Sequence, residues 1–319
     1  MVDRIRIAFI GASHSHGAEK VRVVRQSPDW ELAGVWEQSP AVRASLGETP
    51  FLSLEAILRD PSIPAVAVES EVRDHDAHGR LALEAGKHVH LEKPPADTYT
   101  AFREMADLAE RKHLLLQMGY MWRYNPAIVR ALEAARNGWL GRIYLFRAAM
   151  NTLIGPDRRP EWAEFRGGQM FEQGAHLIDI AVRLLGRPDR VTPFLRKHGA
   201  FEDTLADNTA AVLEYPQAMA IVMASTLQPG AGRHRFVEIL GSDGTAVVRP
   251  IEPPSLAIDL VRPAGPYKAG HQIVDLPRYQ RYEGDFAELA AAIRERRPLA
   301  VSLRDDLLVQ ETLMRASEM

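Results

Sequence analysis

The sequence predicts an α/β domain with a parallel sheet, followed by an α+β domain with a large, mainly antiparallel sheet. Up to about residue 121, short β-branched runs alternate with helical stretches, whereas later strand-like runs follow one another directly. The length of 319 residues fits two domains at ~150 residues each. We therefore expect domains at 1–121 and 122–319, with the terminal helix packing back near the first domain.

The first domain contains five candidate strands and five candidate helices in alternation. The strands are expected over 5–10, 31–36, 65–69, 88–91 and 114–118, and the helices over 17–27, 41–46, 54–59, 74–85 and 99–111. Ser53 and Thr98 are candidate N-caps, and Gly86 is a candidate residue at the end of a helix.

The second domain begins with a helix over 126–136 and continues with strands over 143–150, 208–215, 219–226, 235–240 and 257–261. Turn signals at 215–217 and 241–244 indicate hairpins. Helices over 285–296 and 303–317 close the chain, with Ser302 as a candidate N-cap. Too few helices are present to cover both faces of such a sheet, so we expect a homodimer or homotetramer.

Composition excludes several classes of protein. Lysine and arginine total 39 against 42 acidic residues, so no net positive charge favours nucleic acid. The absence of cysteine excludes thiolate zinc sites, iron–sulfur clusters and a cysteine nucleophile. The apolar run in residues 1–10 is too short for a signal peptide or a membrane span, so we expect a cytoplasmic protein without a membrane or nucleic-acid partner.

A turn typical of dinucleotide binding follows the first strand. Gly11-Ala-Ser-His-Ser-His-Gly17 leads into a helix, whose N-terminal amides can hold a diphosphate, although Ser13 and His16 stand where G-x-G-x-x-G has glycines. Glu37 follows at the end of the second strand, where a carboxylate binds ribose hydroxyls. No cation stands at 38 or 39, which favours NAD over NADP. The alternative is a flavodoxin-like or other α/β fold with an unused turn.

Lys93 follows the strand at 88–91, within Glu92-Lys93-Pro94. Parallel sheets bind ligands at such strand ends, and an ammonium there can stabilise a forming alkoxide. A solvated loop lysine that pairs with Glu92 is the equal alternative.

A buried helix is expected between Gly167 and Gly186. Its ionisable residues Glu172, His176, Asp179 and Arg183 would share one face of an α-helix. His176 is a candidate general base, with Glu172 orienting it or pairing with Lys93. The alternative is a structural histidine bonded to Asp179.

Two H-x-H pairs, His14/His16 and His88/His90, raise the question of a metal site. Residues 14 and 16 lie in a turn rather than on one strand face, so we expect no metal. The chain also lacks G-x-x-x-x-G-K-[ST], G-x-S-x-G and H-E-x-x-H, which leaves kinase, hydrolase and zincin functions without support.

Taken together, the motifs at 10–17, 85–94, 122–126 and 167–179 resemble the glucose–fructose oxidoreductase, inositol dehydrogenase and MocA family over most of the chain. The resemblance implies an N-terminal Rossmann domain that binds NAD(P), an open-faced C-terminal sheet, and hydride transfer at a sugar, polyol or inositol carbon. Lys93 and His176 would be the catalytic pair, joined by Glu172 and expected to meet at the substrate.

Other site residues are expected from the same resemblance. The cofactor-binding residues are Gly11, Ser13, His14, His16, Glu37, Glu69, Ser70, Glu92 and Lys93, and the substrate-binding residues are Arg123, Tyr124, Trp162 and Gln173. The chain departs from the family pattern in three places. Glu172 stands where aspartate is common, Glu69-Ser70-Glu71 replaces Thr-Pro-Asn, and Ser13 replaces the middle glycine.

Two alternatives to a sugar or polyol dehydrogenase use the same fold. One is glycoside cleavage assisted by a retained NAD, and the other is a non-catalytic sugar or NAD sensor. The presence of both Lys93 and His176 argues against a sensor.

Overall fold

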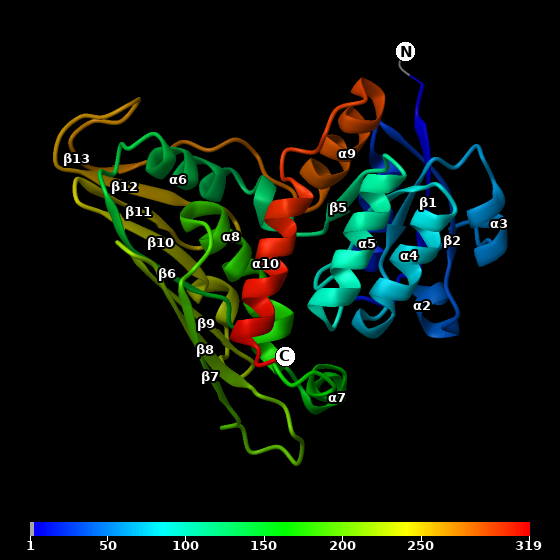
Figure 1. Ribbon diagram of the computed structural model, residues 1–319, viewed down its shortest axis with the longest axis horizontal. Coiled ribbons are helices and arrows are strands. Elements are labelled where there is room, and N and C mark those ends of the chain that lie inside the picture. Colours follow the sequence, from blue (N-terminus) through cyan, green and yellow to red (C-terminus); the bar gives the residue numbers. More distant parts are fainter. Residues whose placement is uncertain (1–2) are drawn as a thin grey trace. The chain divides into compact units, whose positions relative to one another are not determined.

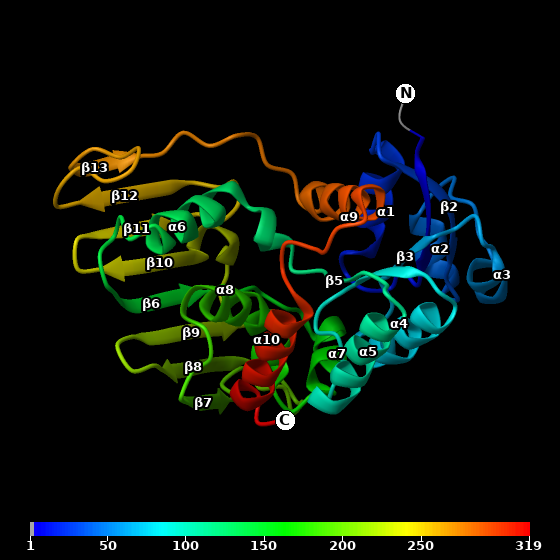
Figure 2. The same cartoon turned by 45° about the horizontal axis from the view of Figure 1, so that its top comes forward.

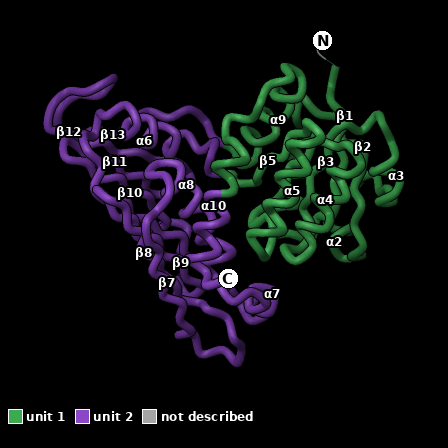
Figure 3. Tube along the Cα trace, viewed as in Figure 1, with its two compact units in different colours: residues 1–121, 280–307 green, residues 122–279, 308–319 purple. Residues whose placement is uncertain are grey.

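The computed structural model describes residues 3–319, which form two compact units (Figures 1 and 3). Unit 1 contains residues 1–121 together with 280–307, and unit 2 contains residues 122–279 and 308–319. The chain therefore returns to its first unit after building most of the second.

Unit 1 is built on a five-stranded parallel sheet with the strand order β2-β1-β3-β4-β5. The strands are β1 (Ile5–Ile10), β2 (Trp30–Trp36), β3 (Ala65–Val68), β4 (His88–Leu91) and β5 (Leu116–Met118). The strand order reverses between β1 and β3, and parallel sheets bind ligands at the carboxyl edge of such a point. The parallel sheet expected from the sequence is confirmed.

Among residues 3–319, six α-helices lie wholly in unit 1 and are labelled in Figure 2, while α10 (Leu303–Ala316) crosses from unit 1 into unit 2. The six are α1 (Gly17–Gln26), α2 (Pro40–Ser45), α3 (Leu54–Arg59), α4 (His75–Glu84), α5 (Tyr99–Arg111) and α9 (Glu283–Glu295). Ser53 and Thr98 cap α3 and α5 as expected, each accepting a backbone N–H three residues on. Although α9 comes late in the sequence, it belongs to unit 1 and contacts β2, since the Phe286 carbonyl accepts a 2.9 Å hydrogen bond from Trp30 Nε1.

Unit 2 contains an eight-stranded sheet with the order β13-β12-β11-β10-β6-β9-β8-β7. Its strands are β6 (Ile143–Ala149), β7 (Arg190–Arg196), β8 (Asn208–Glu214), β9 (Met219–Ser225), β10 (Phe236–Gly241), β11 (Gly244–Val248), β12 (Leu256–Leu260) and β13 (Gly270–Ile273). All neighbours are antiparallel except β6 and β9, so the expected mainly antiparallel sheet is confirmed. The sequence analysis missed β7, β11 and β13.

Helices α6 (Pro126–Arg136) and α8 (Ala175–Leu185) lie against one face of this sheet (Figures 1 and 2). The side chains of β8 and β9 alternate accordingly, with Ala211, Leu213 and Val222 fully buried. On the opposite face, Phe194, which pairs with Ala210, is 45 % exposed. The sheet thus has one covered and one open side within this chain.

The single α-helix expected before Gly186 is wrong over its first turn. Residues Met170–Gly174 form a π-helical turn, and α8 begins only at Ala175. A π-turn has more residues per turn than an α-helix, so the α-helical spacing assumed for Glu172 does not apply over this turn. In residues 3–319, no helix is long and apolar enough to cross a bilayer.

Candidate functional site

The turn after β1 has the backbone geometry of an anion-binding site. Gly11 adopts φ +77°, and a Cβ there would lie 2.6 Å from Ser70 Cα, which follows β3. A Cβ at Gly17 would lie 2.6 Å from the Ala12 carbonyl oxygen. Only glycine fits either position, and α1 begins at Gly17 with its N-terminal amides at the turn.

Glu37 is tied to this turn by its own carboxylate. Its Oε2 accepts the backbone N–H of Ala12 at 2.7 Å, and its Oε1 accepts that of Ser39 at 2.8 Å. These bonds fix the carboxylate at the end of β2 beside the turn, although the side chain is only 8 % exposed. Glu37 therefore both supports the turn and presents an acidic edge to it.

A cavity of about 240 Å³ lies beside Gly11, Ser13 and Glu37. The remaining lining residues are Trp36, Gln38, Ser39, Ser70, Glu71, Arg73, Asp74 and His78. Arg73 is a cation that the sequence analysis did not assign to the site. It is ion-paired with Glu71, and with Glu37 and Asp74 the cavity carries three carboxylates against one guanidinium.

A charged cluster is buried under the same edge of the sheet. Lys20 on α1 is fully buried, and its Nζ donates to Glu69 Oε1 at 2.7 Å and to Glu92 Oε2. The Lys20 Nζ also lies 2.9 Å from His90 Nε2, and His90 Nδ1 lies 2.8 Å from Gln117 Oε1. One ammonium therefore serves two carboxylates at the ends of β3 and β4.

Burial and charge move the pKa values of this cluster in different directions. Burial raises the pKa of Glu69 to about 8, although Lys20 acts against the shift. Burial also disfavours ionisation of Glu92, but the Lys20 ammonium, together with a hydrogen bond from His16, holds the pKa of Glu92 well below its usual value. Burial lowers the pKa of Lys20, yet Glu69 and Glu92 outweigh it and raise that pKa to about 12. Lys20 and Glu92 thus form the buried ion pair of the cluster.

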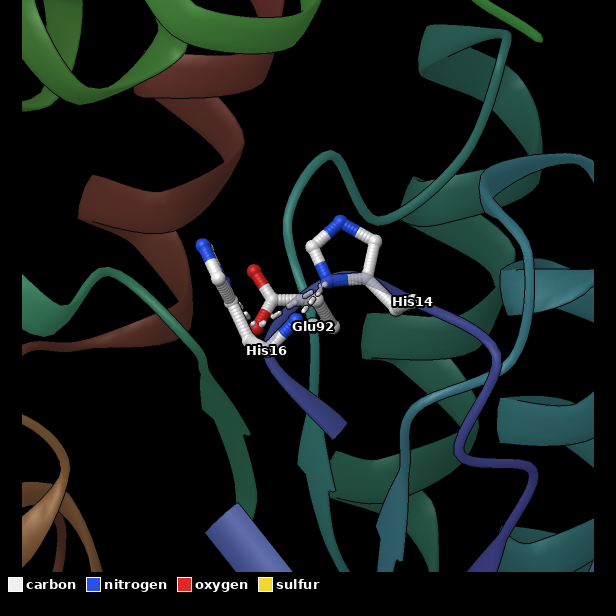
Figure 4. A group of neighbouring side chains, drawn as sticks. All are labelled: His14, His16 and Glu92. Atoms are coloured by element: carbon white, nitrogen blue, oxygen red, sulfur yellow. Dashed lines mark hydrogen bonds and ion pairs between the residues drawn. The ribbon is translucent and has the colours of Figure 1, made fainter. Parts of the chain in front are cut away.

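His14 and His16 approach the same carboxylate (Figure 4). Their Nδ1 atoms lie 4.0 and 3.2 Å from Glu92 Oε2, and the three potential ligand atoms lie within 4.8 Å of one another. Lys20 donates to that same oxygen, and the positive end of α1 adjoins the turn, so a cation is disfavoured here. His88 does not join the group, since its Nδ1 accepts the N–H of Leu115. We retain the expectation of no metal.

Lys93 is 1 % exposed, which removes the alternative of a solvated loop lysine. Its backbone N–H donates to Glu92 Oε1 at 2.9 Å. His75 on α4 holds the neighbouring loops, with Nδ1 2.7 Å from the Pro94 carbonyl oxygen and Nε2 3.0 Å from that of Ser70. Lys93 is therefore part of a packed strand end.

The unit 2 candidates surround α8. His176 is 1 % exposed and packs against Trp122, with ring centroids 5.2 Å apart. Asp179 accepts hydrogen bonds from Arg123 Nε and Nη2 at 3.0 and 2.7 Å, and Arg183 lies 3.8 Å from its other oxygen. Asp179 is thus an arginine partner, rather than the residue that holds His176 in the structural alternative.

The other expected substrate residues are distributed over unit 2. Gln173 Oε1 accepts a 2.9 Å hydrogen bond from Gln169 Nε2 in the π-helical turn that also carries Glu172. Trp162 on α7 (Arg159–Ala163) packs with Ile154 and Leu205 in a small apolar cluster. Tyr124 ends the short 3₁₀ turn Met121–Tyr124 and is partly exposed.

Sequence reasoning missed Lys20, Arg73 and His75. Lys20 follows the glycine turn by one helical turn, and its burial could have been suspected because it faces inward with Val21 and Val24. Arg73 lies 36 positions after Glu37, so only the order of the strands brings the two into one cavity. No local pattern marks that proximity.

A parallel sheet with a glycine turn at the point where its strand order reverses is typical of nucleotide-binding α/β domains, and the order β2-β1-β3-β4-β5 occurs in flavodoxin-like as well as in Rossmann domains. Residues 5–120 match the family model described as an oxidoreductase family with an NAD-binding Rossmann fold, and residues 128–247 match the GFO/IDH/MocA C-terminal domain. The chain belongs to this oxidoreductase family.

Similar proteins include dehydrogenases. The D-glucoside 3-dehydrogenase of Escherichia coli K12 is 30 % identical over 58 % of this chain and 55 % of its own length, so the match spans about half of that relative. The scyllo-inositol 2-dehydrogenase (NADP(+)) IolW of Bacillus subtilis 168 is 27 % identical over 77 % of this chain and 69 % of its own. GenD2 from gentamicin A biosynthesis, solved with NAD, has a TM-score of 0.81 and 23 % identity over 100 % of this chain and 94 % of its own. At that identity the likeness shows the fold alone.

Proposed function

We propose that this oxidoreductase is an NAD-dependent dehydrogenase that transfers a hydride between the nicotinamide and a hydroxyl-bearing carbon of a sugar, polyol or inositol. The observation that carries the proposal is the burial of Lys93 at the carboxyl end of β4, beside the glycine turn. The names of the relatives, which act on a glucoside and on scyllo-inositol, support this substrate class.

The residues at the turn fit a dinucleotide. Gly11 and Gly17 leave the backbone free of Cβ atoms where a diphosphate approaches, and the α1 amides can bind its oxygens. Glu37 and the cavity beside it suit an adenosine ribose. Three carboxylates against one paired guanidinium disfavour a 2′-phosphate, which supports NAD over NADP.

Bound NAD would supply the hydride acceptor. Oxidation of a secondary alcohol also releases the hydroxyl proton, so the chain needs a group to hold the oxygen and a group to take the proton. Lys93 can hold the oxygen through its ammonium, and His176 can accept the proton through its imidazole. The buried Arg123–Asp179 pair fixes the turn before α6 to α8, which carries His176.

A substrate screen tests the proposal. Purified protein with NAD is incubated with sugars, inositols and their acids while NADH absorbance is followed, and Lys93→Ala and His176→Ala serve as controls. Substrate-dependent NADH formation that both variants lose supports the dehydrogenase. Cleavage of a glycoside without NADH release would replace it with chemistry that uses a retained NAD.

A further inference from the structure

Lys20 is an ammonium buried among acidic groups at the carboxyl edge of the unit 1 sheet. Its side chain is fully buried, and Nζ contacts Glu69, Glu92 and His90. The Tyr282 ring covers it, with Nζ 5.4 Å from the ring centroid. A buried lysine is expensive unless it is paired, so a specific role is expected.

The space around this lysine is confined. A Cβ at Gly119, which follows β5, would lie 3.1 Å from Lys20 Nζ and 3.2 Å from Glu92 Oε2. Gly119 therefore leaves room for the ion pair, and a larger residue would crowd it. The ends of β3, β4 and β5 therefore all border the Lys20 ammonium, through Glu69, Glu92 and Gly119.

The cluster adjoins the turn that would bind a diphosphate. Glu92 Oε2, to which Lys20 donates, also lies 3.2 Å from Nδ1 of His16, the N-cap residue of α1. An uncompensated carboxylate at this distance from the turn would repel an incoming anion in a poorly solvated site. His16 cannot supply the compensating charge, since burial lowers its pKa to about 4.

We propose that Lys20 is a positioning residue for the cofactor, which holds Glu92 and Glu69 in place and cancels the charge of Glu92 so that a diphosphate can bind the 11–17 turn. Lys20 would act without touching the dinucleotide. The inference rests on the proposed cofactor site, and it adds a determinant of affinity that the glycine pattern does not contain.

Paired ligands separate this role from simple structural support. ADP carries the diphosphate, whereas adenosine lacks it, so Lys20→Met should weaken ADP binding at least ~10-fold and change adenosine binding less than about twofold. Titrations followed by calorimetry for ADP and by NMR for adenosine measure both. Equal weakening of the two ligands, or none, would overturn the proposal. Failure of ADP to bind the wild-type protein would instead refute the cofactor site itself.

A double substitution that removes both charges of the ion pair provides a second test of the proposal. Lys20→Met combined with Glu92→Gln removes both charges, so ADP affinity should return to within about threefold of the wild type. Glu92→Gln alone leaves the ammonium in excess and should bind ADP more tightly than the wild type, and this arm holds even if Lys20→Met fails to fold. Unchanged or weaker ADP binding by Glu92→Gln would contradict the electrostatic role.

Lys87→Met is the matched control. Lys87 is also a buried lysine of unit 1, 4 % exposed, but its Nζ donates to the Asp60 carbonyl oxygen. Its removal should leave ADP and adenosine affinities unchanged. A loss of ADP affinity equal to that of Lys20→Met would show that any buried lysine of this unit has the same effect.

Discussion

The Glu37 carboxylate accepts the backbone N–H of Ala12 at 2.7 Å, which joins the end of β2 to the glycine turn after β1. A carboxylate that reads a ribose is usually considered only as a ligand contact. Here the same group also accepts a backbone N–H of the turn, so one side chain would determine both the shape of the turn and the proposed preference for NAD.

Glu37→Gln should reduce discrimination between NAD and NADP. The amide oxygen can still accept one backbone N–H, while the negative charge that repels a 2′-phosphate is lost. We expect the ratio of NADP to NAD dissociation constants to fall ~10-fold, as measured by calorimetric titration. Glu55→Gln, on the exposed side of α3, is the control and should leave the ratio unchanged. Equal affinity of the wild type for both cofactors would contradict the proposed NAD preference.

Lys93→Ala and His176→Ala should each lower turnover ~10²–10⁴-fold, because each removes a group that we propose acts on the reacting hydroxyl. His176→Ala should leave NAD affinity unchanged, since His176 belongs to unit 2. If the two groups serve one step, the double variant should lose less than the product of the single losses. Fully multiplicative losses in kcat would show that they act independently.

The buried histidines should make the protein sensitive to acid. Burial lowers the pKa of His16 and of His75 to about 4, and burial and Lys20 lower that of His90 to about 3. Each stays neutral when folded but protonates near pH 6.5 when unfolded, so stability is present above that pH and is lost as the pH falls through the folded values.

The raised pKa of Glu69 makes a contribution of opposite sign to the pH dependence of folding stability over part of this pH range. Its pKa is raised to about 8, so its contribution is present below its unfolded value and is lost as the pH rises towards 8. Near pH 5 the unfolded state would bind about two more protons than the folded state. Stability should then change by up to ~3 kcal/mol per pH unit. Chemical denaturation between pH 4 and 7 checks the slope, and His90→Gln should make it shallower. A flat profile would contradict the assignment of neutral buried histidines.

The open face of the unit 2 sheet should mediate self-association. Phe194 is 45 % exposed there, and it pairs in register with Ala210, which in turn pairs with Met223. Phe194→Asp should shift the mass measured by light scattering towards the monomer at micromolar concentration, because it places a charge on an apolar contact. Leu81→Asp, at an exposed residue of α4, should not. A wild-type mass near 36 kDa would contradict self-association.

The sequence analysis predicted correctly the helices whose bounds depend on residues close to them in the sequence. The bounds of α3, α5 and α6 follow from N-caps and apolar periodicity, and the sequence analysis placed each of them correctly. The glycine turn was also identified from the sequence. Close backbone contacts require glycine at positions 11 and 17, and these two glycines are visible in the sequence itself.

Features that depend on tertiary context were missed. The edge strand β13 has the polar sequence Gly-His-Gln-Ile, and β7 contains Pro193, so neither has the apolar alternation of a central strand. The π-helical turn at Met170–Gly174 leaves no signature in spacing. The Lys20–Glu69–Glu92 cluster joins residues 49 and 72 positions apart, which only the assembled sheet brings together.

The return of residues 280–307 to unit 1 has a consequence for biosynthesis. Trp30 donates to a carbonyl of α9, and Arg294 pairs with Asp29, so β1 and β2 lack these partners until residues 283–295 have been translated. Domains generally fold as units during synthesis, from the N-terminus onwards. In this chain unit 1 is completed only after most of unit 2 has been synthesised, so the Trp30 indole of the nascent sheet would stay exposed to water until α9 is made.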